Sequence, residues 1–285
     1  MSEAFIIRHS KANYKSYDKH LTGEKPEGCF QHQEQVGPDL TEAGVTLAQE
    51  NAKNFFNDLN PNTDELFFVS SNEVRAIDTA NIYKETAVTR GFTIIKPENS
   101  SSVESKDTKV IRSPYAEIVS KGDIRVLENL SLNTDNLLRF LVFSGSVPTV
   151  NWEAIKEDSK NKWLQARQLI EVDNKDSWGG NFVAHSKAVA EILPGVETAQ
   201  RFYETNFKNL IRLLKWADGK IKKYESENQG KKIKVLAFGH EDFLVQFLKD
   251  IFNEEGIKNC EVLSLSTNEI GSVTAGYRKK TKNLE

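Results

Sequence analysis

An arginine and a histidine follow one predicted strand, and a second histidine follows another. Together they could bind an oxyanion and supply a nucleophile or a base. Arg8 and His9 directly follow the apolar run 5–7, and His240 follows a second apolar run at 234–238. An arginine presents a planar fork of N–H donors that suits a phosphate or carboxylate group, and a neutral histidine can act as a nucleophile or a base. A buried strand holds the residues that follow it rigidly, so these positions are suited to a site.

A second arginine, Arg75, comes shortly after the apolar run 67–70, in the expected first turn of a helix. Exposed backbone N–H groups and the helix dipole already favour an anion there. Taken alone, Arg75 is more often a surface residue in an ordinary ion pair, and His240 is more often structural. The carboxyl ends of parallel strands lie at one edge of a sheet, however, so the set favours a shared anion site.

The composition is typical of a soluble globular protein. The chain has 285 residues, of which 38% are hydrophobic and 28% charged, and a formal net charge of −3 gives no reason to expect a nucleic-acid partner. No apolar run approaches the roughly 20 residues that cross a bilayer, so we expect no membrane partner. The two cysteines, Cys29 and Cys260, make no disulfide framework. With no signal-peptide pattern at the N-terminus, we expect a cytoplasmic protein.

Strand and helix patterns alternate along the chain. Short apolar runs predict buried strands at 4–7, 67–70 and 234–238, with weaker candidates at 93–95 and 272–275. Helical periodicity predicts helices over about 41–56, 73–90, 198–226 and 241–252. This alternation predicts an α/β three-layer sandwich, with a mostly parallel central sheet flanked by helices on both faces.

Two stretches interrupt the alternation. Residues 10–38 are polar and predict a long loop over the sheet edge, of a length that usually has a function or is disordered. Residues 96–196 begin with a serine-rich run and then carry separate helical segments. We therefore expect a single α/β domain over 1–285, with 96–196 as an inserted helical lid.

Five groups of residues occur along the chain in an order that can be compared with known families. They are Arg8-His9, Leu40-Thr41-Glu42-Ala43-Gly44, Ser70-Ser71 with Arg75-Ala76 and Thr79-Ala80, Pro194-Gly195-Val196-Glu197-Thr198 with Arg201, and Gly239-His240. Together they resemble the histidine phosphatase superfamily, and its phosphoglycerate-mutase-like branch in particular. The order matches that branch, and the motifs extend over most of the chain.

The resemblance implies phosphoryl transfer through a covalent intermediate. His9 would attack phosphorus and become a transient phosphohistidine. Arg8, Arg75 and His240 would surround the transferred group and neutralise charge on its oxygens. The family needs no metal ion and no cofactor, and the remaining histidines of this chain lack the spacing typical of metal ligands.

The general acid, which protonates the leaving alkoxide, has three candidates. Glu128 is preferred because Leu127-Glu128-Asn129-Leu130 resembles the segment that carries this glutamate in the mutase-like branch. Glu241 and Asp242 directly follow His240, and an acidic residue after the second histidine does this work in the acid-phosphatase branch. Glu241 is also a candidate for substrate binding.

Residues just after His9 depart from the family pattern. Ser10 stands where the family usually has glycine, and its side chain could crowd the phosphate or donate to it. Lys11 and Asn13 lie near the positions where the branch commonly has a threonine and an asparagine. They could replace those phosphate contacts, or belong to a solvated loop.

We therefore expect a metal-independent phosphatase that hydrolyses the phosphate monoester of a small metabolite through phosphohistidine. A phosphomutase of the phosphoglycerate mutase type is the alternative with the same chemistry. A phosphate-binding or interaction module without turnover is the alternative of a different class. The sequence pattern predicts neither the particular substrate nor the oligomeric state.

Overall fold

One mixed sheet of eight strands forms the centre of the fold. A computed structural model describes residues 3–12, 40–71, 74–95, 124–127, 162, 165–166, 168–169, 178–192, 204, 208–228 and 230–284. The strands are β1 (Glu3–Arg8), β2 (Asp64–Ser71), β3 (Thr93–Ile94), β4 (Ile124–Leu127), β5 (Lys232–Gly239), β6 (Val262–Thr267), β7 (Val273–Tyr277) and β8 (Lys280–Leu284). Their order is β3-β2-β5-β1-β6-β7-β8, and β4 also pairs with β2.

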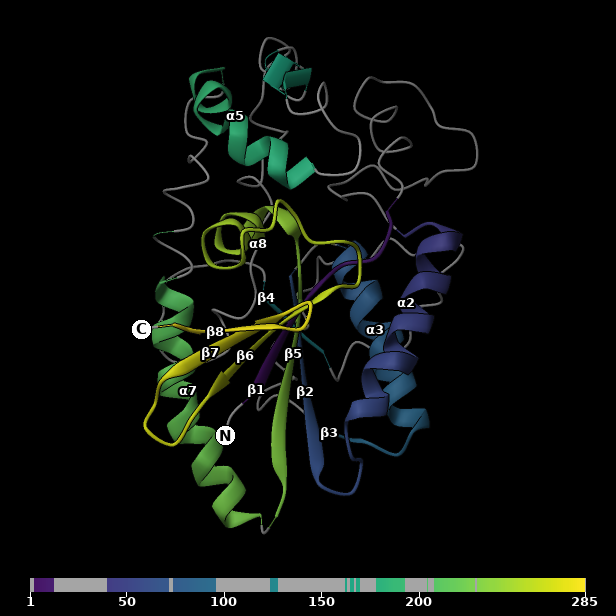
Figure 1. Cartoon of the computed structure of the whole chain (residues 1–285). Coiled ribbons are helices and arrows are strands. Elements are labelled where there is room, and N and C mark those ends of the chain that lie inside the picture. The colour runs from purple at the N-terminus through teal and green to yellow at the C-terminus, as the bar shows by residue number, and fades with distance from the viewer. Residues whose placement is uncertain are drawn as a thin grey trace.

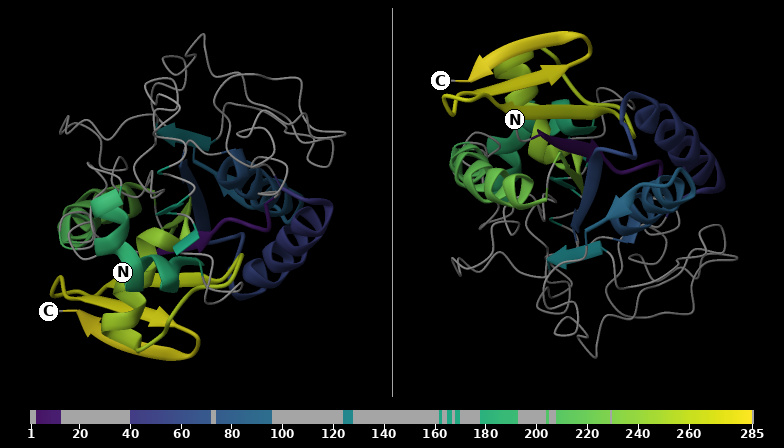
Figure 2. Two further views of the ribbon diagram at one scale, coloured as in Figure 1. Left: turned by 90° about the horizontal axis from the view of Figure 1, so that it is seen from above. Right: turned by 90° about the horizontal axis from the view of Figure 1, so that it is seen from below.

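Helices cover both faces of this sheet (Figures 1 and 2). They are α2 (Glu42–Phe55) with the short 3-10 turn η1 (Phe56–Asp58), α3 (Val74–Thr89), α5 (Trp178–Ile192), α7 (Lys208–Glu227), and α8 (Glu241–Phe247) continued by the π-helical turn η6 (Leu248–Phe252). The helices α2 and α3 lie on one face, and α7 lies on the other (Figure 2). The N-cap of α2 is Thr41, whose hydroxyl accepts a hydrogen bond from the Gly44 N–H.

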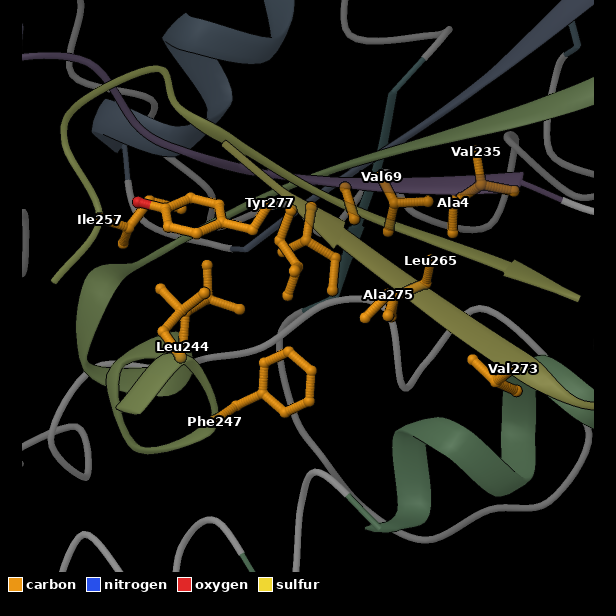
Figure 3. Packing of buried hydrophobic residues seen from close by; sticks show 14 of the residues in the cluster. Ala4, Val69, Val235, Leu244, Phe247, Ile257, Leu265, Val273, Ala275 and Tyr277 are labelled. Atoms are coloured by element: carbon orange, nitrogen blue, oxygen red, sulfur yellow. The ribbon is translucent and has the colours of Figure 1, made fainter. Parts of the chain in front are cut away.

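Alternate side chains of the central strands build two separate cores. Ile7, Phe68 and Phe238 face α2 and α3, where they pack with the helix residues Phe56 and Tyr83. The neighbouring strand positions point to the opposite face and form a second cluster with α8 and the C-terminal strands (Figure 3). Strands buried on both faces explain the continuous apolar runs in the sequence.

The predicted α/β sandwich is confirmed, and its sheet is parallel over the half that carries the motifs. Strands β1, β2, β3, β4 and β5 pair in parallel. The three C-terminal strands β6, β7 and β8 are antiparallel, with β6 beside β1. Each predicted strand has a counterpart, and the helices α2, α3 and α8 begin within a residue of their predicted starts.

The predicted lid over 96–196 lies mostly outside the described residues, as does the polar loop after residue 12. Two elements of the 96–196 stretch are described, besides a few isolated residues between 162 and 169. The strand β4 pairs with β2 and so belongs to the central sheet, while α5 lies beside α8. Across the described part of the chain, no helix is both long enough and apolar enough to traverse a lipid bilayer.

Candidate active site

The two histidines of the sequence motifs lie side by side at the carboxyl edge of the sheet. Parallel pairing sets Arg8 opposite Gly239, so that His9 and His240 are the first residues beyond the two strands. The His9 N–H donates to the Gly239 carbonyl at 2.9 Å. The imidazole centroids are 5.1 Å apart, and the two residues are only 2% and 3% exposed.

Arg75 joins the two imidazoles from the first turn of α3. Its Nε donates to His9 Nε2 at 3.3 Å, and its second terminal nitrogen donates to His240 Nδ1, also at 3.3 Å. The residue is buried. The structure therefore brings His9, Arg75 and His240 into direct contact from three different segments of the chain.

Hydrogen-bond partners assign the proton on each ring. His9 Nδ1 lies 2.6 Å from the Ser10 carbonyl oxygen, which can only accept, so Nδ1 carries the proton and Nε2 carries a lone pair. The partner of His240 Nδ1 is an arginine N–H, which can only donate, so its proton lies on Nε2. His9 is thus oriented as a nucleophile and His240 as a hydrogen-bond donor.

Both histidines are held in the neutral form. Burial, followed by the charges of Arg75 and Arg8, lowers the pKa of His9 well below its usual 6.5, and the hydrogen bond to Ser10 offsets part of this effect. Burial and then Arg75 likewise lower the pKa of His240, with smaller contributions from His9 and Arg8. A neutral His9 is the form that can attack an electrophile.

Arg8 is fixed at two of its three guanidinium nitrogens. One terminal nitrogen forms an ion pair with Glu241 at 2.8 Å, and the other donates to the Ile257 carbonyl. Its Nε–H is buried and has no hydrogen-bond partner within the described part of the chain. Because a buried donor without a partner is costly, this N–H is a candidate contact for a bound anion.

Ser10 is used by the protein itself. Its side chain is fully buried, and its hydroxyl donates to the Gly44 carbonyl at 2.6 Å. Its backbone N–H donates to the Thr79 hydroxyl at 3.0 Å, and that hydroxyl donates to the Arg75 carbonyl at 2.7 Å. The serine hydroxyl thus directs its one hydrogen to the start of α2 and away from a ligand.

We predict that Ser10→Ala lowers the free energy of unfolding by about 1–2 kcal/mol, because a buried hydrogen bond is lost. Urea unfolding followed by circular dichroism measures this change. Ser226→Ala is the matched control, since the Ser226 hydroxyl donates over the same 2.6 Å to a backbone carbonyl but is exposed. A Ser10→Ala change no larger than that of the control would contradict the structural role.

The glycine of the Leu40–Gly44 motif allows α2 to approach the segment after His9. A Cβ atom at position 44 would lie 2.1 Å from the Lys11 carbonyl oxygen, which also accepts from the Thr41 N–H at 3.0 Å. Lys11 itself is exposed. The described contacts of Lys11 are therefore made by its backbone, which ties this segment to α2.

The other predicted site residues are not all described. Glu128 and Asn13 lie outside the described residues, and so does the side chain of Asp242. Glu241 is buried next to Arg8. The motif at 194–201 also lies outside the described part of the chain.

Sequence reasoning missed the turn that precedes β6. The Asn259 side-chain amide donates to the His9 carbonyl at 2.8 Å, and the Cys260 N–H donates to the Arg8 carbonyl at 3.0 Å. These two contacts fix the backbone of the Arg8-His9 pair, while the Ile257 carbonyl holds the Arg8 side chain. Alternating apolar and polar residues at 263–266 are the signal that could have predicted β6, and thus this turn.

Comparison with known proteins finds similarity only among solved structures. No protein-family profile matches the chain, and no curated protein matches it significantly. A variant phosphoserine phosphatase of Entamoeba histolytica is 11% identical, with a TM-score of 0.39 over 100% of this chain and 96% of that one. The α-ribazole phosphatase of Shigella flexneri is 13% identical, with a TM-score of 0.40 over 98% and 96%.

A mycobacterial glucosyl-3-phosphoglycerate phosphatase is 14% identical, with a TM-score of 0.32 over 95% of this chain and 92% of that one. These three proteins are histidine phosphatases. They belong to the superfamily that the sequence motifs of this chain resemble.

Proposed function

We propose that this chain is a histidine phosphatase that hydrolyses the phosphate monoester of a small metabolite through a phosphohistidine on His9. One observation carries the proposal: a buried, neutral imidazole keeps its Nε2 lone pair on the side where Arg75 presents its donors. A nucleophile directed at a cluster of fixed positive donors is suited to a phosphorus atom with anionic oxygens.

In the first step His9 Nε2 forms a bond to phosphorus while the bond from phosphorus to the ester oxygen breaks. The developing charge on the phosphoryl oxygens is stabilised by donors from Arg75, the buried Nε–H of Arg8 and the Nε2–H of His240. The leaving alkoxide takes a proton from a general acid. In the second step the same group, now deprotonated, takes a proton from water as the water oxygen forms a bond to phosphorus, and His9 Nε2 leaves with its lone pair.

Glu128 is the general acid that we propose, with Glu241 and Asp242 as alternatives. Leu127, the last residue of β4, pairs with Ser71, the last residue of β2, and Glu128 is the next residue in the sequence. Because β2 leads directly to Arg75, this register supports a role for Glu128 at the same sheet edge.

A panel of small phosphate monoesters, incubated with the protein and a chelator, tests the proposed function. Release of inorganic phosphate supports the phosphatase. Movement of the phosphoryl group within a substrate, without phosphate release, would replace it by the mutase. Binding of inorganic phosphate without turnover of any ester would replace it by a binding module, and activity abolished by the chelator would contradict the metal-independent mechanism.

The low pKa of His9 predicts the pH dependence of turnover. Protonation removes the nucleophile, and the lowered pKa means that this occurs only below the ordinary value of 6.5. We therefore expect the acidic limb of kcat/KM, which reports on the free enzyme, to lie below pH 6.5. Initial rates on p-nitrophenyl phosphate, measured between pH 4 and pH 8, locate this limb to within about a few tenths of a pH unit. An acidic limb at or above pH 6.5, the ordinary pKa of a histidine, would contradict the assignment of this limb to His9.

A further inference from the structure

Glu241 is the buried carboxylate that lies directly beside the proposed phosphate-binding groups. It follows His240 and begins α8, and its Oε2 is 2.8 Å from a terminal nitrogen of Arg8. Its side chain is 5% exposed and that of Arg8 is 14% exposed, so water screens this ion pair weakly. Removing one partner from such a pair leaves an uncompensated charge in a buried place.

The contacts of Arg8 determine where its Nε–H points. The ion pair with Glu241 holds one terminal nitrogen and the Ile257 carbonyl holds the other. A planar guanidinium with both terminal nitrogens held has no rotational freedom left, so its Nε–H is fixed as well. That N–H is buried and has no hydrogen-bond partner in the described part of the chain.

We propose that Glu241 is a positioning residue that holds the Arg8 guanidinium, so that its Nε–H meets the phosphoryl group, and that it is not the general acid. A general acid must carry a proton before the reaction. The Arg8 guanidinium, 2.8 Å from Glu241, instead stabilises the unprotonated carboxylate. This inference rests on the proposed phosphatase function and assigns one residue within its site.

The two roles differ in how the effect of a mutation depends on the leaving group. A general acid matters most for an alkyl phosphate, whose alkoxide is a poor leaving group, and little for p-nitrophenyl phosphate, whose phenolate leaves without a proton. A misplaced Arg8 weakens stabilisation of the phosphoryl oxygens, which are common to both substrates. Positioning therefore predicts equal losses on the two substrates.

The test measures kcat/KM of the native chain, Glu241→Gln and Glu241→Ala on an alkyl phosphate and on p-nitrophenyl phosphate. We expect Glu241→Ala to lose about 10- to 100-fold on both substrates. Glu241→Gln keeps an oxygen that accepts from Arg8, so it should recover most of that loss, to within about threefold of the native chain. A loss confined to the alkyl phosphate, and equal in the two variants, would identify Glu241 as the general acid and overturn the inference.

A double-mutant cycle with Arg8→Ala adds a readout that a general structural defect would not give. If Glu241 acts through Arg8, then Glu241→Ala costs less than about threefold when Arg8 is already absent. A full additional loss in that background would overturn the inference. Circular dichroism checks that each variant is folded. If Glu241→Ala does not fold, Glu241→Gln still allows the test, because it preserves the side-chain volume.

Glu3→Ala is the matched control for breaking an ion pair. Glu3 pairs with Lys234 at the opposite end of the same two strands, β1 and β5. Its loss should leave kcat/KM on both substrates within about twofold of the native chain. A native chain that hydrolyses neither substrate would contradict the proposed function, whereas substrate-dependent losses in an active chain would contradict only the role of Glu241.

Discussion

His9→Ala is expected to abolish phosphate release, with kcat/KM falling by about 10⁴-fold or more, because the proposed covalent intermediate needs the imidazole nitrogen. Water in the space left by the ring has no comparable nucleophilicity at neutral pH. Phosphate release from p-nitrophenyl phosphate measures the loss. An alkaline quench with a radiolabelled ester measures the intermediate directly, since a phosphorus–nitrogen bond survives in base.

The native chain should retain label after the quench and His9→Ala should not. His185→Ala is the control histidine, because His185 lies in the helix α5 and belongs to none of the sequence motifs of the proposed site. It should retain both turnover and label. Label on the His9→Ala variant, or turnover near that of the native chain, would exclude His9 as the nucleophile.

Strand ends could be predicted from the sequence because buried strands leave a simple signal. The apolar runs before His9 and His240 are continuous since both faces of β1 and β5 are covered by helices. Parallel pairing then requires that the residues after these runs share an edge. Arg75 was predictable for a similar reason, as a cation in the first turn after β2.

The antiparallel part of the sheet left a weaker signal. In β6 buried residues alternate with partly buried ones, so it contains no continuous apolar run. The strand β8 is almost wholly exposed and its lysines indicate a solvated tail, yet it pairs with β7. The contact between Asn259 and His9, which are 250 positions apart, depends on this pairing and has no local sequence signature.

The direction of the Ser10 side chain could not be predicted from the sequence. Its position next to His9 was predictable, but the direction of its side chain depends on how the backbone turns after β1. Because Gly44 lies close to this segment, the Ser10 hydroxyl can donate to the Gly44 carbonyl in α2. A serine in place of the usual glycine is therefore compatible with an open phosphate site, because the added hydroxyl group is buried on the protein side.

Arg75→Lys and Arg75→Met are expected to separate the geometry of this arginine from its charge. A lysine keeps the charge but has one ammonium group, which cannot donate to His9 and His240 along two fixed directions as the guanidinium does. We expect kcat/KM of Arg75→Lys to fall by about 10²- to 10³-fold, the usual cost of losing a preorganised donor to a developing oxyanion. Arg75→Met should fall further.

The acidic limb of kcat/KM distinguishes the two variants. The charge of Arg75 is the second largest cause, after burial, of the lowered His9 pKa. Arg75→Met removes that charge, so the His9 pKa and the acidic limb should rise, whereas Arg75→Lys should leave the limb near its native position. Arg90→Lys, a change at a partly exposed residue just beyond the other end of α3, should alter neither quantity. If Arg75→Lys retained activity within about threefold of the native chain, the bridging geometry would be dispensable, and Arg75 would act only as a positive charge near the nucleophile.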